Sequence, residues 1–235
     1  MFRLALFTPI EQLDRLAAAF ATRRPPAVVP PCYDFGPGGR NVVVYESRFG
    51  RLCRQEMAWG LVPGHLDPRN IPRVPWTEAT IDEARDGRVL RHTWRAQRCV
   101  VPVDAIFAFG AGGRYPQRYC VRRADSQPFF VAAVWDGNDD PRELERGREV
   151  PYRGFCLLTR KTTGSMATMF PDVPVILSAA AIHSWATPAI CETADIERLA
   201  LPDSAELVAY PVNNDAKGVQ LLVAYTPSQQ STSRA

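Results

Sequence analysis

The sequence predicts an α+β fold that is mainly antiparallel β-sheet with a few peripheral helices. Three observations predict it. Many short apolar runs are separated by turn residues, helical spacing is confined to a few segments, and strands and helices do not alternate regularly. The chain has 235 residues, 46% of them hydrophobic and 23% charged. This is the composition of a globular protein that is long enough to bury a core.

Four segments have the spacing of helices. Residues 10–23 place an apolar side chain at every third or fourth position, and a proline pair ends the segment. Residues 78–94 show similar spacing, interrupted near Gly87. Shorter helices are predicted over residues 179–186 and 190–200.

The remaining apolar runs are predicted as strands, because they are short, rich in β-branched and aromatic residues, and bounded by turn residues. They are residues 42–45, 52–61, 99–103, 106–109, 118–121, 129–135, 154–159 and 207–212. The highly charged segment 136–150 is predicted to be an exposed excursion. Residues 1–224 are expected to form a single domain, followed by a disordered polar tail at 225–235.

Composition also limits the location and the cofactors. The formal net charge is +3, which by itself does not indicate a nucleic-acid-binding protein. No apolar run approaches the roughly 20 residues of a membrane helix, and the apolar N-terminus is too short for a signal peptide. We therefore expect a cytoplasmic protein with no membrane partner. Six cysteines and three histidines lack zinc-site spacing, so neither a metal nor a cofactor is predicted.

Four short motifs stand out but carry no chemistry of their own. Residues 36–39 (GPGG) and 110–113 (GAGG) lack the Lys-Ser/Thr and the helix of a phosphate-binding loop, so both are predicted to be tight turns. Residues 59–63 (WGLVP) and 174–177 (PVIL) contain no catalytic side chain. Taken alone, they indicate core and turn.

Six segments in a fixed order resemble the SOS response-associated peptidase (SRAP) family. They are residues 33–37 (YDFGP), 59–63 (WGLVP), 98–104 (RCVVPVD), 128–135 (PFFVAAVW), 173–177 (VPVIL) and 211–214 (PVNN). The match covers about residues 1–220. This resemblance implies a barrel-like fold of mainly antiparallel strands.

The resemblance also implies a covalent activity. SRAP proteins bind single-stranded DNA carrying an abasic site and join to it through a cysteine exposed by loss of the initiator methionine. An asparagine, a glutamate and a histidine assist. Aligned on the motifs, these four positions hold Phe2, Glu78, Ala108 and Phe170. A phenyl or methyl group is neither a nucleophile nor a proton carrier, so we expect both the crosslinking and the autopeptidase activity to be absent.

The DNA-contact positions that the resemblance implies have changed as well. They hold Asp34, His65, Thr80 and Asp172. Carboxylates repel phosphates, so these changes disfavour the family's mode of binding. Three arginines remain as candidate phosphate contacts, Arg3, Arg95 and Arg98, with solvated surface arginines as the alternative interpretation.

Three functions are compatible with this sequence. The first is a pseudoenzyme of the DNA damage response that still binds single-stranded DNA without a covalent bond. The second is a partner-binding scaffold without DNA affinity, which the acidic replacements favour. The third is a repurposed pocket in which Asp34, His65, Glu78 and Asp172 converge on a divalent cation or a small ligand. The sequence identifies neither a particular protein partner nor an oligomeric state.

Overall fold

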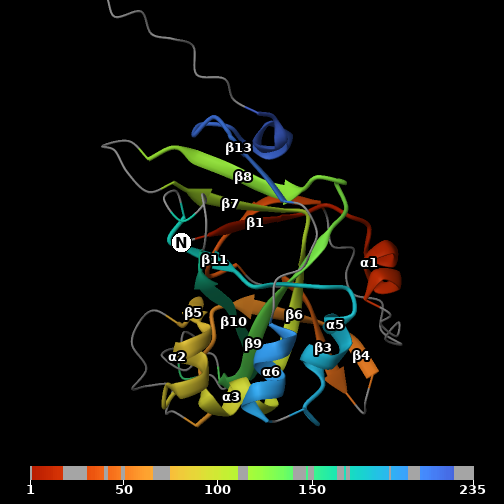
Figure 1. Ribbon diagram of the computed structural model, residues 1–235, viewed down its shortest axis with the longest axis vertical. Coiled ribbons are helices and arrows are strands. Elements are labelled where there is room, and N and C mark those ends of the chain that lie inside the picture. Colours follow the sequence, from red (N-terminus) through yellow and green to blue (C-terminus); the bar gives the residue numbers. More distant parts are fainter. Residues whose placement is uncertain are drawn as a thin grey trace, which may run out of the picture.

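The computed structural model describes residues 2–17, 31–39, 42–48, 51–65, 75–110, 116–139, 147, 151–162, 167, 170–190, 192–200 and 207–224. These residues form two sheets, with the α-helices gathered mainly beside the larger one (Figure 1). The predicted α+β class is confirmed. The tail 225–235, for which disorder was predicted, lies outside the described residues.

The smaller sheet is antiparallel throughout. Its strands lie in the order β13 (Leu207–Pro211), β8 (Arg118–Arg123), β7 (Ala105–Phe109), β1 (Arg3–Leu6) and β2 (Cys32–Phe35). The sequence analysis missed β1 and β2, which have four residues each and show no alternation of apolar and polar positions. Their pairing partners, not their own pattern, make them strands.

The larger sheet closes on itself. It comprises β11 (Asp172–Pro174), β10 (Pro151–Lys161), β4 (Arg51–Trp59), β3 (Val42–Arg48), β6 (Arg98–Val103), β9 (Phe129–Asp139) and β12 (Ile176–Leu177), with β5 (Glu78–Thr80) paired to β10. Gly154 and Phe155 pair with β4 along one edge and with β9 along the other. Strands β10, β4, β3, β6 and β9 therefore form a ring, which is the barrel-like arrangement expected.

Gly154 in β10 is a glycine because the backbone after β4 passes very close to it. A Cβ added at Gly154 would lie 2.1 Å from the carbonyl oxygen of Gly60, and no side chain fits there. Gly60 follows Trp59, whose ring stacks on Phe155 with centroids 6.1 Å apart. The motif at residues 59–63 is thus core and turn, as predicted.

Buried side chains separate into layers. One core cluster lies between the larger sheet and the helices and includes Trp94 and Trp185. A second lies on the opposite side of the same strands, where Leu4 and Ile106 of the smaller sheet pack against Val101 and Val131. A third covers the outer face of the smaller sheet with the C-terminal segment around η3 (Gly218–Leu222).

Five described α-helices complete the fold. They are α1 (Ile10–Leu16), α2 (Ile81–Asp86), α3 (Arg91–Ala96), α5 (Ala181–Ala186) and α6 (Thr193–Leu199). The helix predicted over 78–94 was wrong at its start, because residues 78–80 pair in parallel with β10. The predicted interruption near Gly87 is confirmed, and it separates α2 from α3.

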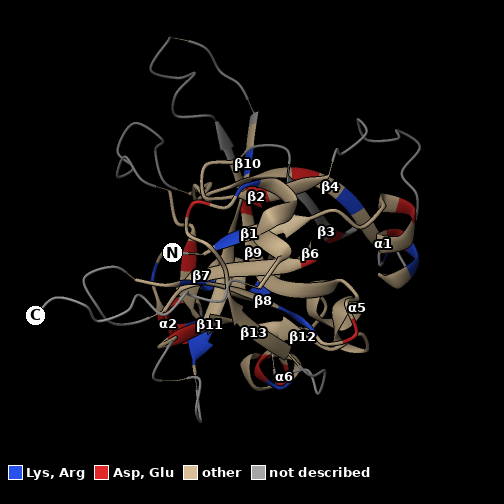
Figure 2. Ribbon diagram, turned by 90° about the horizontal axis from the view of Figure 1, so that it is seen from above, with Lys and Arg blue, Asp and Glu red and all other residues tan. Residues whose placement is uncertain are grey.

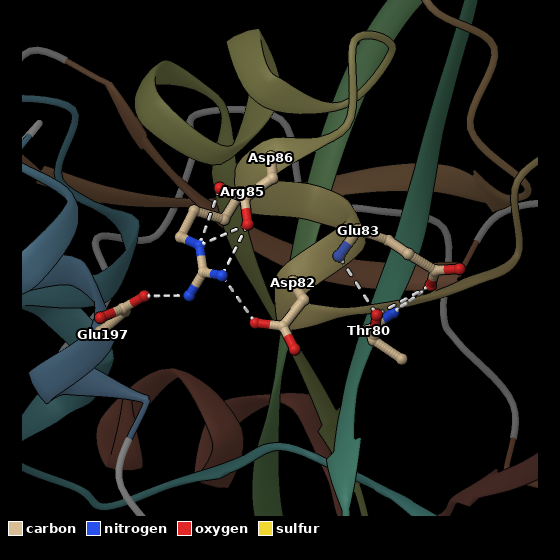
Figure 3. Close-up of polar contacts among 6 residues, drawn as sticks. All are labelled: Thr80, Asp82, Glu83, Arg85, Asp86 and Glu197. Carbon is tan, nitrogen blue, oxygen red and sulfur yellow. Dashed lines mark hydrogen bonds and ion pairs between the residues drawn. The ribbon is translucent and has the colours of Figure 1, made fainter.

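Arg85 ties α2 to α6 (Figure 3). Its guanidinium contacts three carboxylates: Glu197 at 2.6 Å, Asp82 at 2.8 Å, and Asp86 through Nε and Nη2. These bonds raise the pKa of Arg85 and lower that of Asp86. All three acidic side chains are therefore committed to one cation.

The prediction of an exposed excursion from residue 136 was wrong at its beginning. Strand β9 continues to Asp139, and the Asp136 side chain is buried. Its carboxylate accepts hydrogen bonds from the backbone N–H groups of Gly64 and Gly137, both at 2.8 Å. Residues 140–146 and 148–150 lie outside the described part of the chain.

Candidate functional site

Phe2 lies at the junction of the two sheets, directly before β1. Its side chain is 7% exposed, and its backbone N–H donates a hydrogen bond to Glu78 Oε1 at 2.9 Å. Glu78 opens β5, 76 residues further along the chain. Two of the four positions inferred from the motifs are thus in direct contact.

The other two positions lie in the same core cluster as Phe2. Ala108 is 6% exposed and Phe170 is 3% exposed. The ring of Tyr119, whose Cα pairs with that of Ala108, meets the Phe170 ring edge-on at 5.5 Å. We call Phe2, Ala108, Tyr119 and Phe170 the residue-2 cluster. The residues that the resemblance aligns with three of the family's catalytic positions therefore belong to an apolar core cluster.

Asp34 is held by two arginines. Arg3 Nε lies 2.5 Å from Asp34 Oδ1, and Arg118 Nη2 lies 3.0 Å from the same oxygen. Arg118 is buried and stacks over the Phe107 ring at 4.7 Å, whereas the Arg3 side chain is 41% exposed. Arg118 was not predicted as a site residue, because it lies 84 positions after Asp34 and no local pattern links the two.

Asp172 is also paired. Lys161 on β10 reaches it at 3.0 Å across the β10–β11 ladder, where their Cα atoms are partners. The carboxylates of Asp34 and Asp172 are therefore matched by cations, and that of Glu78 by a backbone donor. Figure 2 shows the same intermixing of acidic and basic segments.

Thr80 has a structural role at the start of α2 (Figure 3). Its hydroxyl accepts a hydrogen bond from the Glu83 backbone N–H, while Glu83 Oε2 accepts one from the Thr80 backbone N–H at 2.8 Å. This reciprocal capping box satisfies donors that a helix otherwise leaves unpaired. Thr80 thus fixes the start of α2 two residues after Glu78, which binds the Phe2 backbone.

The divalent-cation site predicted at Asp34, His65, Glu78 and Asp172 is not found among the described residues. His65 is exposed in a turn after residues 59–63. Asp34 and Asp172 face separate cations, as described above. Among the described residues, no three His, Cys, Asp or Glu side chains lie close enough together to hold a metal ion.

The two arginines near α3 have opposite environments. Arg95 is exposed on α3. Arg98 is 1% exposed, and its guanidinium donates to the backbone carbonyls of Trp94, Arg95, Trp185, Thr187 and Ile190. The prediction of Arg98 as a phosphate contact is wrong, because every arm of its guanidinium joins the end of α3 to the α5 region.

The buried cysteines provide no replacement nucleophile. Burial raises the pKa of the Cys99 thiol, with a smaller contribution from Glu46. Burial likewise raises the pKa of the Cys156 thiol, with smaller contributions from Glu78 and Glu83. Thiols with raised pKa values are poor nucleophiles, and Cys99 and Cys156 are both free and buried.

The architecture and the site define an α+β protein in which the N-terminus enters a site between a small sheet and a barrel-like sheet. The family model described as "SOS response associated peptidase (SRAP)" matches residues 2–219, so the chain belongs to the SRAP family. The chain is 27% identical to the abasic site processing protein YedK of Escherichia coli (strain K12) over 153 residues. That alignment covers 65% of this chain and 63% of YedK, less than two thirds of the relative's length.

Solved structures share the fold. A protein from Bacteroides thetaiotaomicron is similar with a TM-score of 0.77 and 18% identity, covering 92% of this chain and 93% of its own. A protein from Bordetella bronchiseptica is similar with a TM-score of 0.71 and 20% identity, covering 90% and 99%. Within the described residues, no helix is both long enough and apolar enough to span a membrane.

Proposed function

We propose that this protein is a SRAP family member without covalent chemistry that binds single-stranded DNA non-covalently in the DNA damage response. The observation that carries the first part is the residue-2 cluster. A buried phenyl ring occupies the nucleophile position, and Ala108 and Phe170 occupy two supporting positions. None of these side chains can attack an aldehyde or move a proton.

Family membership and the activity named for the relative YedK support the choice of DNA as partner. YedK is described as an abasic site processing protein. Non-covalent binding to single strands needs accessible cations, which release counterions from phosphates. Arg3 at the edge of the site and Arg95 on α3 are such cations. The cytoplasmic location expected from the sequence remains part of this proposal.

The test uses one labelled single-stranded oligonucleotide, with and without an abasic site. Each is incubated with the full chain and run on native and denaturing gels. The proposal expects a native shift that weakens with salt and no band that survives denaturation. A denaturation-stable adduct would overturn the loss of covalent chemistry, and the absence of any shift at low salt would overturn DNA binding.

Pairing of charges at the site favours a second candidate, a partner-binding scaffold. Asp34 neutralises part of the Arg3–Arg118 charge, and Asp172 neutralises Lys161. A site with its cations already paired attracts phosphate less strongly. This candidate predicts no oligonucleotide shift at any salt concentration, so the same gels separate it from the first.

A further inference from the structure

Three exposed arginines at α3 form a basic surface, which we call the α3 arginine surface (Arg88, Arg91 and Arg95). The Arg91 backbone N–H donates to the Gly87 carbonyl at 3.1 Å, so helical geometry already includes Arg88. Residues at spacings of three and four lie on one helix face. The opposite face, with Leu90, Thr93 and Trp94, is buried.

Nearby acidic side chains are already committed elsewhere. On α2, Asp82 and Asp86 bind Arg85, and Glu83 closes the capping box with Thr80 (Figure 3). Asp86 is close enough to Arg91 for that charge to lower its pKa further, but Arg85 is the main cause. Arg85 offsets one of these negative charges, so α2 keeps a net negative charge beside the three arginines, although each of its carboxylates is already held by an ion pair or hydrogen bond to Arg85 or Thr80.

The α3 arginine surface makes no polar contact of its own. Within the described part of the chain, its three guanidinium groups take part in no hydrogen bond or ion pair. Other surface arginines are paired: Arg123 with Asp125, Arg153 with Glu46, and Arg198 with Asp195. Like charges on adjacent helix turns repel one another, and a cation at the start of a helix opposes the helix dipole. A polyanion bound to this face would relieve both.

We propose that the α3 arginine surface is the phosphate-backbone contact of this protein for single-stranded nucleic acid. This inference rests on the proposed DNA binding and gives it a place outside the residue-2 cluster. Arg88 and Arg95 are separated by about 10 Å along the helix axis. Successive phosphates of one strand lie about 3.4 Å apart along a duplex axis, so three arginines can meet neighbouring phosphates without reading sequence.

The test compares two variants that lose the same charge. Arg88→Gln/Arg91→Gln/Arg95→Gln removes the surface, while Arg15→Gln/Arg51→Gln/Arg198→Gln removes three exposed arginines elsewhere. Binding of a labelled oligo(dT) is measured by fluorescence anisotropy at several salt concentrations. Three lost phosphate contacts should reduce the slope of log Kobs against log salt by about 2. Affinity at low salt should fall roughly tenfold or more for the first variant, and far less for the control.

The outcomes separate the two proposals. In one outcome the wild-type protein binds while both triple variants lose affinity equally, and in another it binds while neither variant loses any. Either result overturns the role of the α3 arginine surface and leaves the proposed DNA binding intact. No binding by wild-type protein overturns both. Circular dichroism confirms that the variants fold. If the triple variant unfolds, Arg95→Gln alone should still reduce the slope by about 0.7, and an unchanged slope would count against the surface.

Discussion

The backbone N–H of Phe2 and the carboxylate of Glu78 are joined by a hydrogen bond of 2.9 Å that connects the smaller sheet to β5. The resemblance aligns Phe2 with the family's nucleophile and Glu78 with its asparagine, and this alignment stays a prediction. The hydrogen bond joins two residues that are 76 positions apart in the sequence. It also gives Glu78 a structural role that needs no chemistry.

Substitution at Glu78 tests that role. Glu78→Gln keeps an oxygen acceptor and should change stability little, whereas Glu78→Ala leaves the part-buried Phe2 N–H unpaired. The loss expected for Glu78→Ala is about 1–3 kcal/mol, measured by urea unfolding followed by tryptophan fluorescence. Equal losses in both variants would show that the charge of Glu78, not its hydrogen bond to Phe2, stabilises the protein.

Phe2 should behave as a core residue despite its place at the end of the chain. Phe2→Ala removes a buried ring from the residue-2 cluster, and the cost expected for a buried phenylalanine is about 3 kcal/mol. Phe109→Ala is the matched control, because Phe109 is 50% exposed on β7. That control should change the free energy of unfolding by less than about 1 kcal/mol. Similar losses in both variants would contradict the burial of Phe2.

Substitutions at Arg98 and Arg95 should have different effects: the first on stability, the second on oligonucleotide binding. Arg98→Ala removes the guanidinium donor from five backbone carbonyls and should destabilise the protein by about 3 kcal/mol or more. Arg95→Ala should cost no more than about 0.5 kcal/mol, yet it should weaken oligonucleotide binding. Thermal unfolding and anisotropy on the same preparations check both. A stable Arg98→Ala protein would contradict the network.

Asp34→Asn should increase affinity for single-stranded DNA. The carboxylate forms ion pairs with Arg3 and Arg118. An amide in its place removes the negative charge beside Arg3, which then keeps its hydrogen bond to the Asp34 backbone carbonyl and can attract phosphate more strongly. One added contact steepens the salt dependence of log Kobs by about 0.7. Asp195→Asn, which frees the remote Arg198, is the control. If the two variants bind alike, the Arg3 side of the site does not face the nucleic acid.

The raised pKa of Tyr210 should make the free energy of unfolding decrease at high pH. Burial, followed by the hydrogen bond to Cys120, raises its pKa to about 12, and its hydroxyl donates to the Leu222 carbonyl at 2.9 Å. The unfolded phenol titrates near about 10, so between these values the folded state holds more protons. Stability is therefore complete below about pH 10 and falls as pH rises toward about 12. Tyr210→Phe should lose less over this range in urea unfolding; identical pH profiles would refute the assignment.

Several elements could be predicted from local sequence. The strands at residues 99–103, 106–109 and 129–135 were found because their apolar runs are short and bounded by turns. The glycine-rich turn at 36–39 was also found, and it is closed by the Gly39 N–H to the Gly36 carbonyl at 3.0 Å. Strand β1 was not predicted, because its four residues are too few to show a recognisable strand pattern.

The sequence by itself determined the α+β class and the family, since these depend on residue type and order along the chain. Only the tertiary structure decided what surrounds each charge. Arg95 and Arg98 are the same residue type three positions apart, yet one is exposed and the other buried. The difference comes from α5, which packs over Arg98 from almost 90 residues away, and no local pattern encodes such a contact.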